Sequence, residues 1–201
     1  VPRSVYDELE ARGIPYHDAT CPFVQKIQRI AAQAEKEGAV LLVAGDKTHP
    51  EVQGIVGHTR GEVFVFADLA ELEAWNGPSD PQKPLFAVAQ TTFQVTKWKE
   101  SSEFLKKAYT NARIFDTICN ATWARQQEAE DLSQQCDIIV VIGGHHSSNT
   151  QKLVQVAAKH TRAVTVETAS ELRPEWFADV KVAGVTAGAS TPSSIIEEVL
   201  N

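Results

Sequence analysis

Short runs of β-branched and other apolar residues alternate along the chain with stretches in which apolar positions recur every three or four residues. This alternation is typical of successive βα units on a mostly parallel sheet, and it predicts an α/β fold. The apolar runs predict strands at 14–19, 39–44, 62–66, 85–89, 112–117, 137–142, 163–166 and 182–186. The amphipathic stretches predict helices at 2–12, 22–37, 69–75, 94–109, 122–135, 149–160 and 192–200.

The second half of the chain repeats the first half about one hundred residues later. Asp18-Ala19-Thr20-Cys21 returns as Asp116-Thr117-Ile118-Cys119, and the loop that begins at Gly45 returns at Gly143, both at an offset of 98. A fixed offset across several blocks is the mark of repeated structural units. We therefore predict two repeated βα units, at 14–111 and 112–201, with a separate helical segment at 1–13.

Unusual polar residues follow the predicted strands. In open parallel sheets, ligands bind beyond the carboxyl ends of the strands. We therefore predict one composite site on that rim. The contributing segments are Thr20-Cys21, Thr48-His49-Pro50-Glu51, Gln90-Thr91-Thr92, Cys119 to Thr122, Gly143 to Asn149, and Thr186 to Thr191.

Cys21 and Cys119 each lie between a predicted strand and a predicted helix. Helix N-termini favour negative charge, and the thiolate is the form of cysteine that binds metal. Taken singly, either residue could be a core thiol or part of a weak zinc site, but their equivalence in the repeat favours a shared metal centre. Cys136 precedes a strand, at the opposite end of the sheet, and is interpreted as a buried structural thiol.

Two kinds of polar chemistry surround the cysteines. His49 and Glu51 could form a proton-delivery pair, although a polar loop residue and a first-turn helix charge are the simpler interpretation. The glycine turns at 143–149 and 186–192 could hold two linked phosphates, although either turn alone could be ordinary N-capping. For Gln90-Thr91-Thr92, capping is the default and contact with a substrate hydroxyl the sharper hypothesis.

Composition narrows the class of protein. The 201 residues are 43% hydrophobic and 22% charged, with no apolar run near the roughly 18 residues that span a bilayer, so no membrane segment is expected. The net charge of −7 argues against a large nucleic-acid interface. Three cysteines indicate a reducing, cytoplasmic setting rather than a disulfide framework. Because the chain has no Met and begins at Val1, we expect residues ahead of it.

Taken in order, the motifs resemble those of the 4-hydroxy-3-methylbut-2-enyl diphosphate reductases, the LytB (IspH) family of iron–sulfur enzymes. The resemblance covers essentially the whole chain. It rests on Asp-Ala-Thr-Cys-Pro at 18–22, His-Pro-Glu-Val at 49–52, Gln-Thr-Thr at 90–92, Thr-Ile-Cys-Asn-Ala-Thr at 117–122, Ser-Ser-Asn-Thr at 147–150 and Thr-Ala-Gly-Ala-Ser-Thr-Pro at 186–192.

The resemblance implies three α/β units around a pseudo-threefold axis, each giving one cysteine to a central 4Fe–4S cluster. Here the first unit is expected to be absent, with its cysteine and two histidines, and 1–13 would be its terminal helix. The metal ligands in this chain would be Cys21 and Cys119. The implied catalytic residues are Glu51, His49 and Thr91, and the implied diphosphate-binding residues are His49, Ser147, Ser148, Asn149 and Ser190.

The implied activity is reductive removal of the allylic hydroxyl of 4-hydroxy-3-methylbut-2-enyl diphosphate, giving isopentenyl and dimethylallyl diphosphate. This is the last step of the methylerythritol phosphate route to isoprenoids, and a ferredoxin or flavodoxin would donate the electrons. Two alternatives remain for the chain itself. It could be an inactive apo scaffold or diphosphate-binding module, or a two-cysteine zinc protein.

Overall fold

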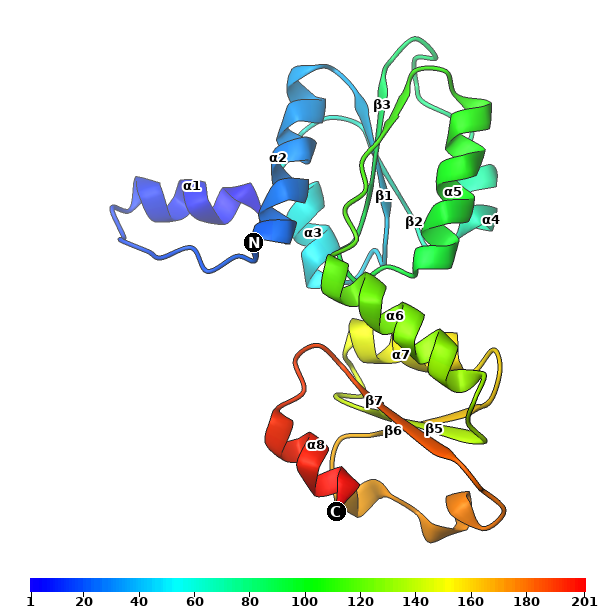
Figure 1. The fold of residues 1–201 in the computed structure, drawn as a ribbon. Coiled ribbons are helices and arrows are strands. Elements are labelled where there is room, and N and C mark those ends of the chain that lie inside the picture. The colour runs from blue at the N-terminus through cyan, green and yellow to red at the C-terminus, as the bar shows by residue number, and fades with distance from the viewer. The chain divides into compact units, whose positions relative to one another are not determined.

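The computed structural model describes residues 1–201, which divide into two compact units, Val1–Ile118 and Cys119–Asn201 (Figure 1). Each unit is described by itself. The helices of the first unit are α1 (Arg3–Ala11), α2 (Pro22–Lys36), α3 (Pro50–Val56), α4 (Leu69–Glu73) and α5 (Val95–Ala108). Its strands are β1 (Val40–Ala44), β2 (Val63–Phe66), β3 (Leu85–Ala89) and β4 (Ala112–Ile114).

The first unit is a three-layer α/β/α structure. Its strands form one parallel sheet in the order β2-β1-β3-β4. Helices α2 and α3 cover one face and α4 and α5 the other, as Figure 1 shows. Side chains alternate between faces along a strand, so Leu42 of β1 joins the α4–α5 core while Leu41 and Val43 join the α2–α3 core. All of β1 and β3 is buried, as expected for parallel strands with helices on both faces.

The second unit repeats this plan with three strands. Its elements are α6 (Asn120–Ser133), β5 (Ile138–Ile142), α7 (Ser148–Ala157), β6 (Arg162–Val166), the 3₁₀ turns η1 (Ala169–Glu171) and η2 (Pro174–Phe177), β7 (Ala183–Ala187) and α8 (Ser193–Leu200). The sheet order is β6-β5-β7, again all parallel. Helices α6 and α7 cover one face of β5, and α8 with the two 3₁₀ turns covers the other.

The structure confirms the predicted repeat. The order β2-β1-β3 of the first sheet matches β6-β5-β7 of the second. Residue Val40 pairs with Leu85 in the first unit, and the residues 98 positions later, Ile138 and Ala183, pair in the second. The helices α2, α3 and α5 likewise begin 98 residues before α6, α7 and α8.

One predicted strand is absent. Residues 14–19 are irregular and exposed, with 44% of Ile14 and 40% of Tyr16 accessible. Their counterparts at 112–117 include β4, which forms because it pairs with β3. A strand needs a neighbour for its backbone N–H and C=O groups, and residues 14–19 have no strand beside them.

The division between units also lies further along the chain than predicted. Strand β4, expected to open the unit at 112–201, belongs to the first sheet, and the units separate between Ile118 and Cys119. The Thr117 hydroxyl extends this pairing, because it donates to Ala89 O at 2.7 Å and accepts from Ala89 N at 2.8 Å. The segment that leads into the second unit is therefore tied to the first unit's sheet.

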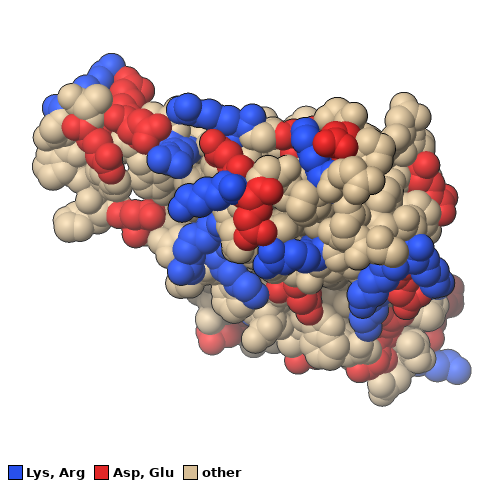
Figure 2. All heavy atoms as spheres, turned by 90° about the horizontal axis from the view of Figure 1, so that it is seen from above, with Lys and Arg blue, Asp and Glu red and all other residues tan.

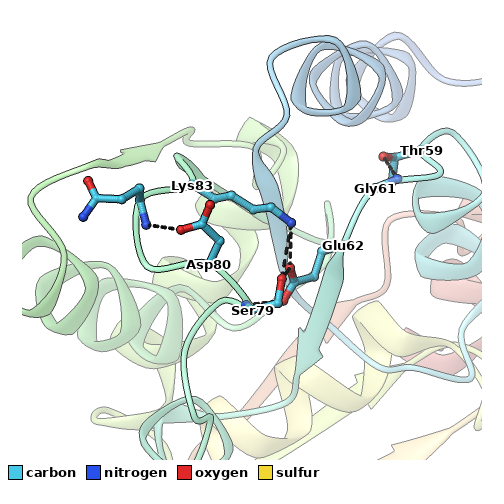
Figure 3. A network of polar contacts seen from close by, with 7 residues as sticks. Thr59, Gly61, Glu62, Ser79, Asp80 and Lys83 are labelled. Atoms are coloured by element: carbon cyan, nitrogen blue, oxygen red, sulfur yellow. Dashed lines mark hydrogen bonds and ion pairs between the residues drawn. The ribbon is translucent and has the colours of Figure 1, made fainter.

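The loop at 76–84 is anchored at the amino end of the first sheet by Glu62. This carboxylate accepts hydrogen bonds from Ser79 N at 3.0 Å and Ser79 Oγ at 2.6 Å, and it lies 3.3 Å from Lys83 Nζ (Figure 3). The Ser79 hydrogen bonds, aided by Lys83, lower the pKa of Glu62.

At the amino end of the second sheet, Gly184 and Asp137 fix the approach to β7. A Cβ added to Gly184 would lie 2.9 Å from Cys136 Sγ and collide with the side chain of Ile139. Asp137 accepts the backbone N–H groups of Val182 and Lys181, and these bonds lower its pKa. Partly buried Cys136 packs with the α6–α7 core here, on the side predicted for a structural thiol.

Charges of both signs are interspersed on the face in Figure 2, where neither Lys and Arg nor Asp and Glu gather into one continuous field. None of the helices combines the length and apolar character needed to traverse a bilayer.

Candidate functional site

At the carboxyl end of β1, the chain turns into α3 at His49. His49 is the N-cap, and its Nδ1 accepts the backbone N–H of Glu51 at 3.1 Å. Pro50 occupies the first helical position, where it fits because its missing N–H would have no partner there. A neutral ring that accepts at Nδ1 carries its proton on Nε2, which leaves that atom as a donor.

Glu51 is fixed by the turn that follows β3. Thr91 donates twice to its carboxylate, from N to Oε1 at 2.7 Å and from Oγ1 to Oε2 at 2.7 Å. Thr91 is only 7% exposed. The structure thus brings Thr91 to the turn that holds His49 and Glu51, and the three predicted residues form one hydrogen-bonded cluster.

The same turn closes upon itself through Gln90. Its buried side chain accepts Asp46 N at 3.3 Å and donates to Thr92 Oγ1 at 3.2 Å. A Cβ on Gly45 would lie 3.2 Å from Gln90 Cβ and 2.7 Å from Val52, so glycine is required there. At the carboxyl end of the first sheet, the polar side chains of these turns therefore hydrogen-bond within the unit.

The second unit leaves the equivalent place open. Asn149 stands 98 residues after Glu51, and Ala189 stands 98 residues after Thr91. Asn149 is 6% exposed, yet neither its Nδ2 nor its Oδ1 has a hydrogen-bond partner. Alanine has no hydroxyl, so the second unit lacks the side-chain partner that Thr91 gives to Glu51. Buried polar groups without partners are uncommon and costly.

Two glycines lie close to the side chain of Thr150, the residue that follows Asn149. Gly143 follows β5 with φ of 152°, and a Cβ there would lie 2.6 Å from Thr150 Oγ1 and 3.0 Å from Thr191 Oγ1. A Cβ on Gly188, which follows β7, would lie 2.7 Å from Thr150 Oγ1. Thr150 Oγ1 is also buried without a partner. The backbone thus approaches this one unpaired hydroxyl closely from two turns.

The turn at 143–149 leads into α7, a helix of ten residues. Ser147 is its N-cap and accepts Thr150 N at 3.3 Å, as the capping interpretation predicts. The helix dipole and its first N–H groups favour an anion at this end. Ser148 and Asn149 lie in the first turn, and Ser190 lies exposed in the adjacent turn between Gly188 and α8. Four of the five predicted diphosphate-binding residues therefore occupy neighbouring turns at one edge of the second sheet, and the fifth, His49, lies in the first unit.

The cysteines occupy matching positions in their units. Cys21 is the exposed N-cap of α2, and Cys119 is the half-buried N-cap of α6. Cys119 Sγ accepts Thr122 N at 3.3 Å and lies 3.1 Å from Thr122 Oγ1. No three His, Cys, Asp or Glu side chains are grouped so as to hold a metal ion. That both sulfurs face one centre concerns the two units together and stays a prediction.

Sequence reasoning gave Gln90 too little weight and did not select Glu167 and Glu171. Glu167 Oε1 accepts His145 N at 2.6 Å, and Glu171 Oε2 lies 3.0 Å from His145 Nε2. The hydrogen bond from Glu167 N is the main cause of the lowered pKa of Glu171, with His145 adding to it. The recurrence of Glu71 as Glu171 was the available signal.

Comparison with known proteins places the chain in a family. A profile described as LytB protein matches residues 1–201. Proteins named 4-hydroxy-3-methylbut-2-enyl diphosphate reductase from Helicobacter pylori (strain P12) and Nautilia profundicola are 40% and 36% identical over 200 and 202 residues. The matches cover 99% and 100% of this chain and 72% of each relative.

A solved structure is also similar throughout the chain. The E-1-hydroxy-2-methyl-but-2-enyl-4-diphosphate reductase from Plasmodium falciparum matches with a TM-score of 0.92 and 26% identity, covering 100% of this chain and 64% of that one. The chain therefore belongs to the LytB family, an enzyme family whose similar members are named as reductases of a hydroxymethylbutenyl diphosphate.

Proposed function

We propose that this chain carries the diphosphate-binding and proton-delivering residues of a 4-hydroxy-3-methylbut-2-enyl diphosphate reductase. The observation that carries the proposal is Asn149, a buried amide with no partner at the N-terminus of α7. Its equivalent in the first unit, Glu51, is fully paired by Thr91. In this proposal the second unit binds the ligand through Asn149, and the first unit keeps the Glu51 carboxylate in a fixed position.

The diphosphate would be held at the rim of the second unit. Asn149 Nδ2 can donate to a phosphate oxygen, and the first N–H groups of α7 add to the attraction without a formal charge. Ser148 and Ser190 would contribute hydroxyls. Ser147 caps α7 through Oγ, and this oxygen can still donate its own hydrogen to a phosphate. His49 would add a donor from Nε2, since Nδ1 is occupied by Glu51 N.

Glu51 and Thr91 would deliver a proton. The Thr91 hydroxyl donates to Glu51, so its oxygen remains free to accept from a substrate hydroxyl. For delivery both hydrogen bonds reverse: a protonated Glu51 donates to Thr91 Oγ1, and the Thr91 hydroxyl donates its own hydrogen to the leaving hydroxyl, with both side chains already within reach. In the overall reaction the allylic C–O bond breaks, two electrons and two protons are taken up, and the hydroxyl leaves as water while a C–H bond forms.

The cysteines suit an iron–sulfur cluster, because thiolates are its usual protein ligands. Cys21 and Cys119 would supply two of them, with the remaining ligand from outside these residues. When bound, a 4Fe–4S cluster supplies the electrons, which arrive from a ferredoxin or flavodoxin, and a Lewis-acidic iron for the hydroxyl.

A preceding unit of the same fold would complete the architecture. By the 98-residue offset, α1 corresponds to 101–109, the C-terminal half of α5, and 14–19 corresponds to the segment that contains β4. Both pack against a sheet in the first unit, whereas here Val5 and Ile14 are exposed. We infer that α1 and residues 14–19 finish a sheet layer that precedes them.

The binding proposal is tested by titrating the chain with inorganic pyrophosphate in a calorimeter. Loss of a hydrogen bond to a charged group should weaken binding of Asn149→Ala by about 10- to 100-fold. Gln134→Ala, which removes an exposed amide from the C-cap of α6, should bind like wild type. Equal affinities for Asn149→Ala and wild type would reject the proposed diphosphate site.

The cluster and proton roles need separate measurements. After anaerobic reconstitution of the full-length protein, Cys21→Ser and Cys119→Ser should lose iron and visible absorption, whereas Cys136→Ser should keep both. Glu51→Gln should keep pyrophosphate affinity and lower turnover at least 100-fold, the usual scale of general acid catalysis. Undiminished turnover would remove Glu51 from proton delivery.

A further inference from the structure

Both units contain the same contact between the loop that follows the central strand and a glutamate that follows the neighbouring strand. We call this contact the bracket; it is Lys47–Glu71 in the first unit and His145–Glu171 in the second. In the first unit, Lys47 Nζ lies 3.4 Å from Glu71 Oε2, which also accepts Ala67 N at 3.0 Å. In the second unit, His145 Nε2 lies 3.0 Å from Glu171 Oε2, and that oxygen also accepts Glu167 N at 3.1 Å. A basic residue in the loop thus meets a carboxylate that is itself anchored by backbone.

The second unit strengthens its bracket at two further points. Glu167 Oε1 accepts the backbone N–H of His145 at 2.6 Å, where the first unit has Ala67 and no carboxylate. Gln151 of α7 donates its side-chain amide to His145 O at 2.8 Å. His145 is therefore held through its N–H, its carbonyl and its ring, two residues before the helix N-cap Ser147.

We propose that His145 is a positioning residue, which Glu171 and Glu167 use to hold the turn at 143–149 in its anion-binding form. The inference rests on the proposed diphosphate site. The turn begins with two glycines, one of them at φ of 152°, so it has many conformations to lose when a ligand binds. Fixing His145 in advance removes part of that entropic cost and so increases affinity.

The charge balance explains why a basic residue is needed. Glu167 and Glu171 both approach the loop that is to receive an anion, and their negative charge opposes binding. The ring N–H of His145 engages Glu171, and a lysine at this position would in addition offset the negative charge. The first unit uses lysine for the same contact, so lysine at position 145 should serve equally well.

The test compares the pyrophosphate affinity of His145→Ala, Glu171→Gln and His145→Lys with wild type by calorimetry. His160→Ala is the matched control. It removes another half-exposed histidine–glutamate contact of the same unit, 3.4 Å from His160 Nε2 to Glu130 Oε1. Hydrogen exchange of amides 143–149, followed by mass spectrometry without ligand, reports the order of the turn directly.

We expect His145→Ala and Glu171→Gln to weaken affinity by about three- to fivefold and to speed exchange at 143–149. His145→Lys should restore both quantities, and His160→Ala should change neither. Unchanged exchange and affinity in His145→Ala and Glu171→Gln overturn the inference, as does failure of His145→Lys to restore them. If Asn149→Ala has wild-type affinity while His145→Ala still loosens the turn, the diphosphate site fails and the bracket stands.

Discussion

Replacing Asn149 and Glu51 by leucine should change stability in opposite directions, although the two residues occupy equivalent positions. Both lie in the first turn of the helix that follows a central strand. Glu51 receives two hydrogen bonds from Thr91, whereas both polar atoms of Asn149 lack a partner. Leucine has the same branching and the same number of side-chain heavy atoms as asparagine, so Asn149→Leu removes the unpaired group and keeps the shape, although its methyl groups are larger.

The magnitudes follow from the cost of burying polar groups. An unsatisfied buried donor or acceptor costs about 1–3 kcal/mol, so Asn149→Leu should raise the free energy of unfolding of the second unit by about 1 kcal/mol. Glu51→Leu leaves Thr91 N and Oγ1 unpaired in a residue that is 7% exposed. It should lower the free energy of unfolding of the first unit by about 2 kcal/mol.

Native-state hydrogen exchange measures the two units separately through slowly exchanging amides in β5 and β1. The same Asn149→Leu protein should also lose pyrophosphate binding, so a gain in stability would accompany a loss of function. A destabilisation of the second unit by 1 kcal/mol or more in Asn149→Leu would refute the claim that the amide is unpaired in the free protein.

Three further predictions concern the scaffold. Gly184→Ala should cost about 1–3 kcal/mol because the new methyl group overpacks the α6–α7 core, whereas Gly144→Ala, whose nearest neighbour is at 3.8 Å, should be near neutral; urea denaturation checks both. Because folding lowers the pKa of Asp137, the ionised carboxylate stabilises the protein fully at pH values above its unfolded-state pKa of about 4, and this stabilisation is lost as the pH falls through the folded-state pKa. Asp137→Asn should remove that part of the acid dependence of Tm. Glu62→Gln should weaken the anchor of the loop at 76–84 and speed its cleavage in limited proteolysis, and an unchanged cleavage rate would contradict the anchoring role.

Local pattern was sufficient for most of the secondary structure and for the repeat. Buried parallel strands appear in sequence as continuous apolar runs, so β1, β3, β5 and β7 were predicted within a residue of their observed bounds. The repeat offset then predicted which loops are equivalent, and the observed registers agree with it. The short helix α3 was not predicted, because only its first turn carried a recognisable signal.

Pairing between distant segments was beyond sequence patterns. Residues 14–19 have the composition of a strand, but a strand forms only where a partner is available, and that depends on tertiary structure. The boundary between the units was misplaced for the same reason, because β4 pairs with β3, which precedes it in the chain, and so belongs to the first sheet. The contact between Glu51 and Thr91 spans 40 residues, so neither the closed rim of the first unit nor the open rim of the second could be inferred before the fold.

The two units differ at a few positions at the carboxyl ends of their strands, and these differences account for the different roles proposed for them. Where the first unit has Glu51, Thr91 and Gln90, the second has Asn149, Ala189 and Gly188. The first set satisfies its own hydrogen bonds and keeps a carboxylate in a fixed place, which suits proton transfer. The second set removes the partners and leaves a neutral buried amide beside a helix N-terminus, which suits an anion. On the proposed function, the missing hydroxyl at position 189 is what leaves the second rim open to the diphosphate, because Ala189 cannot make the side-chain hydrogen bond that Thr91 makes to Glu51.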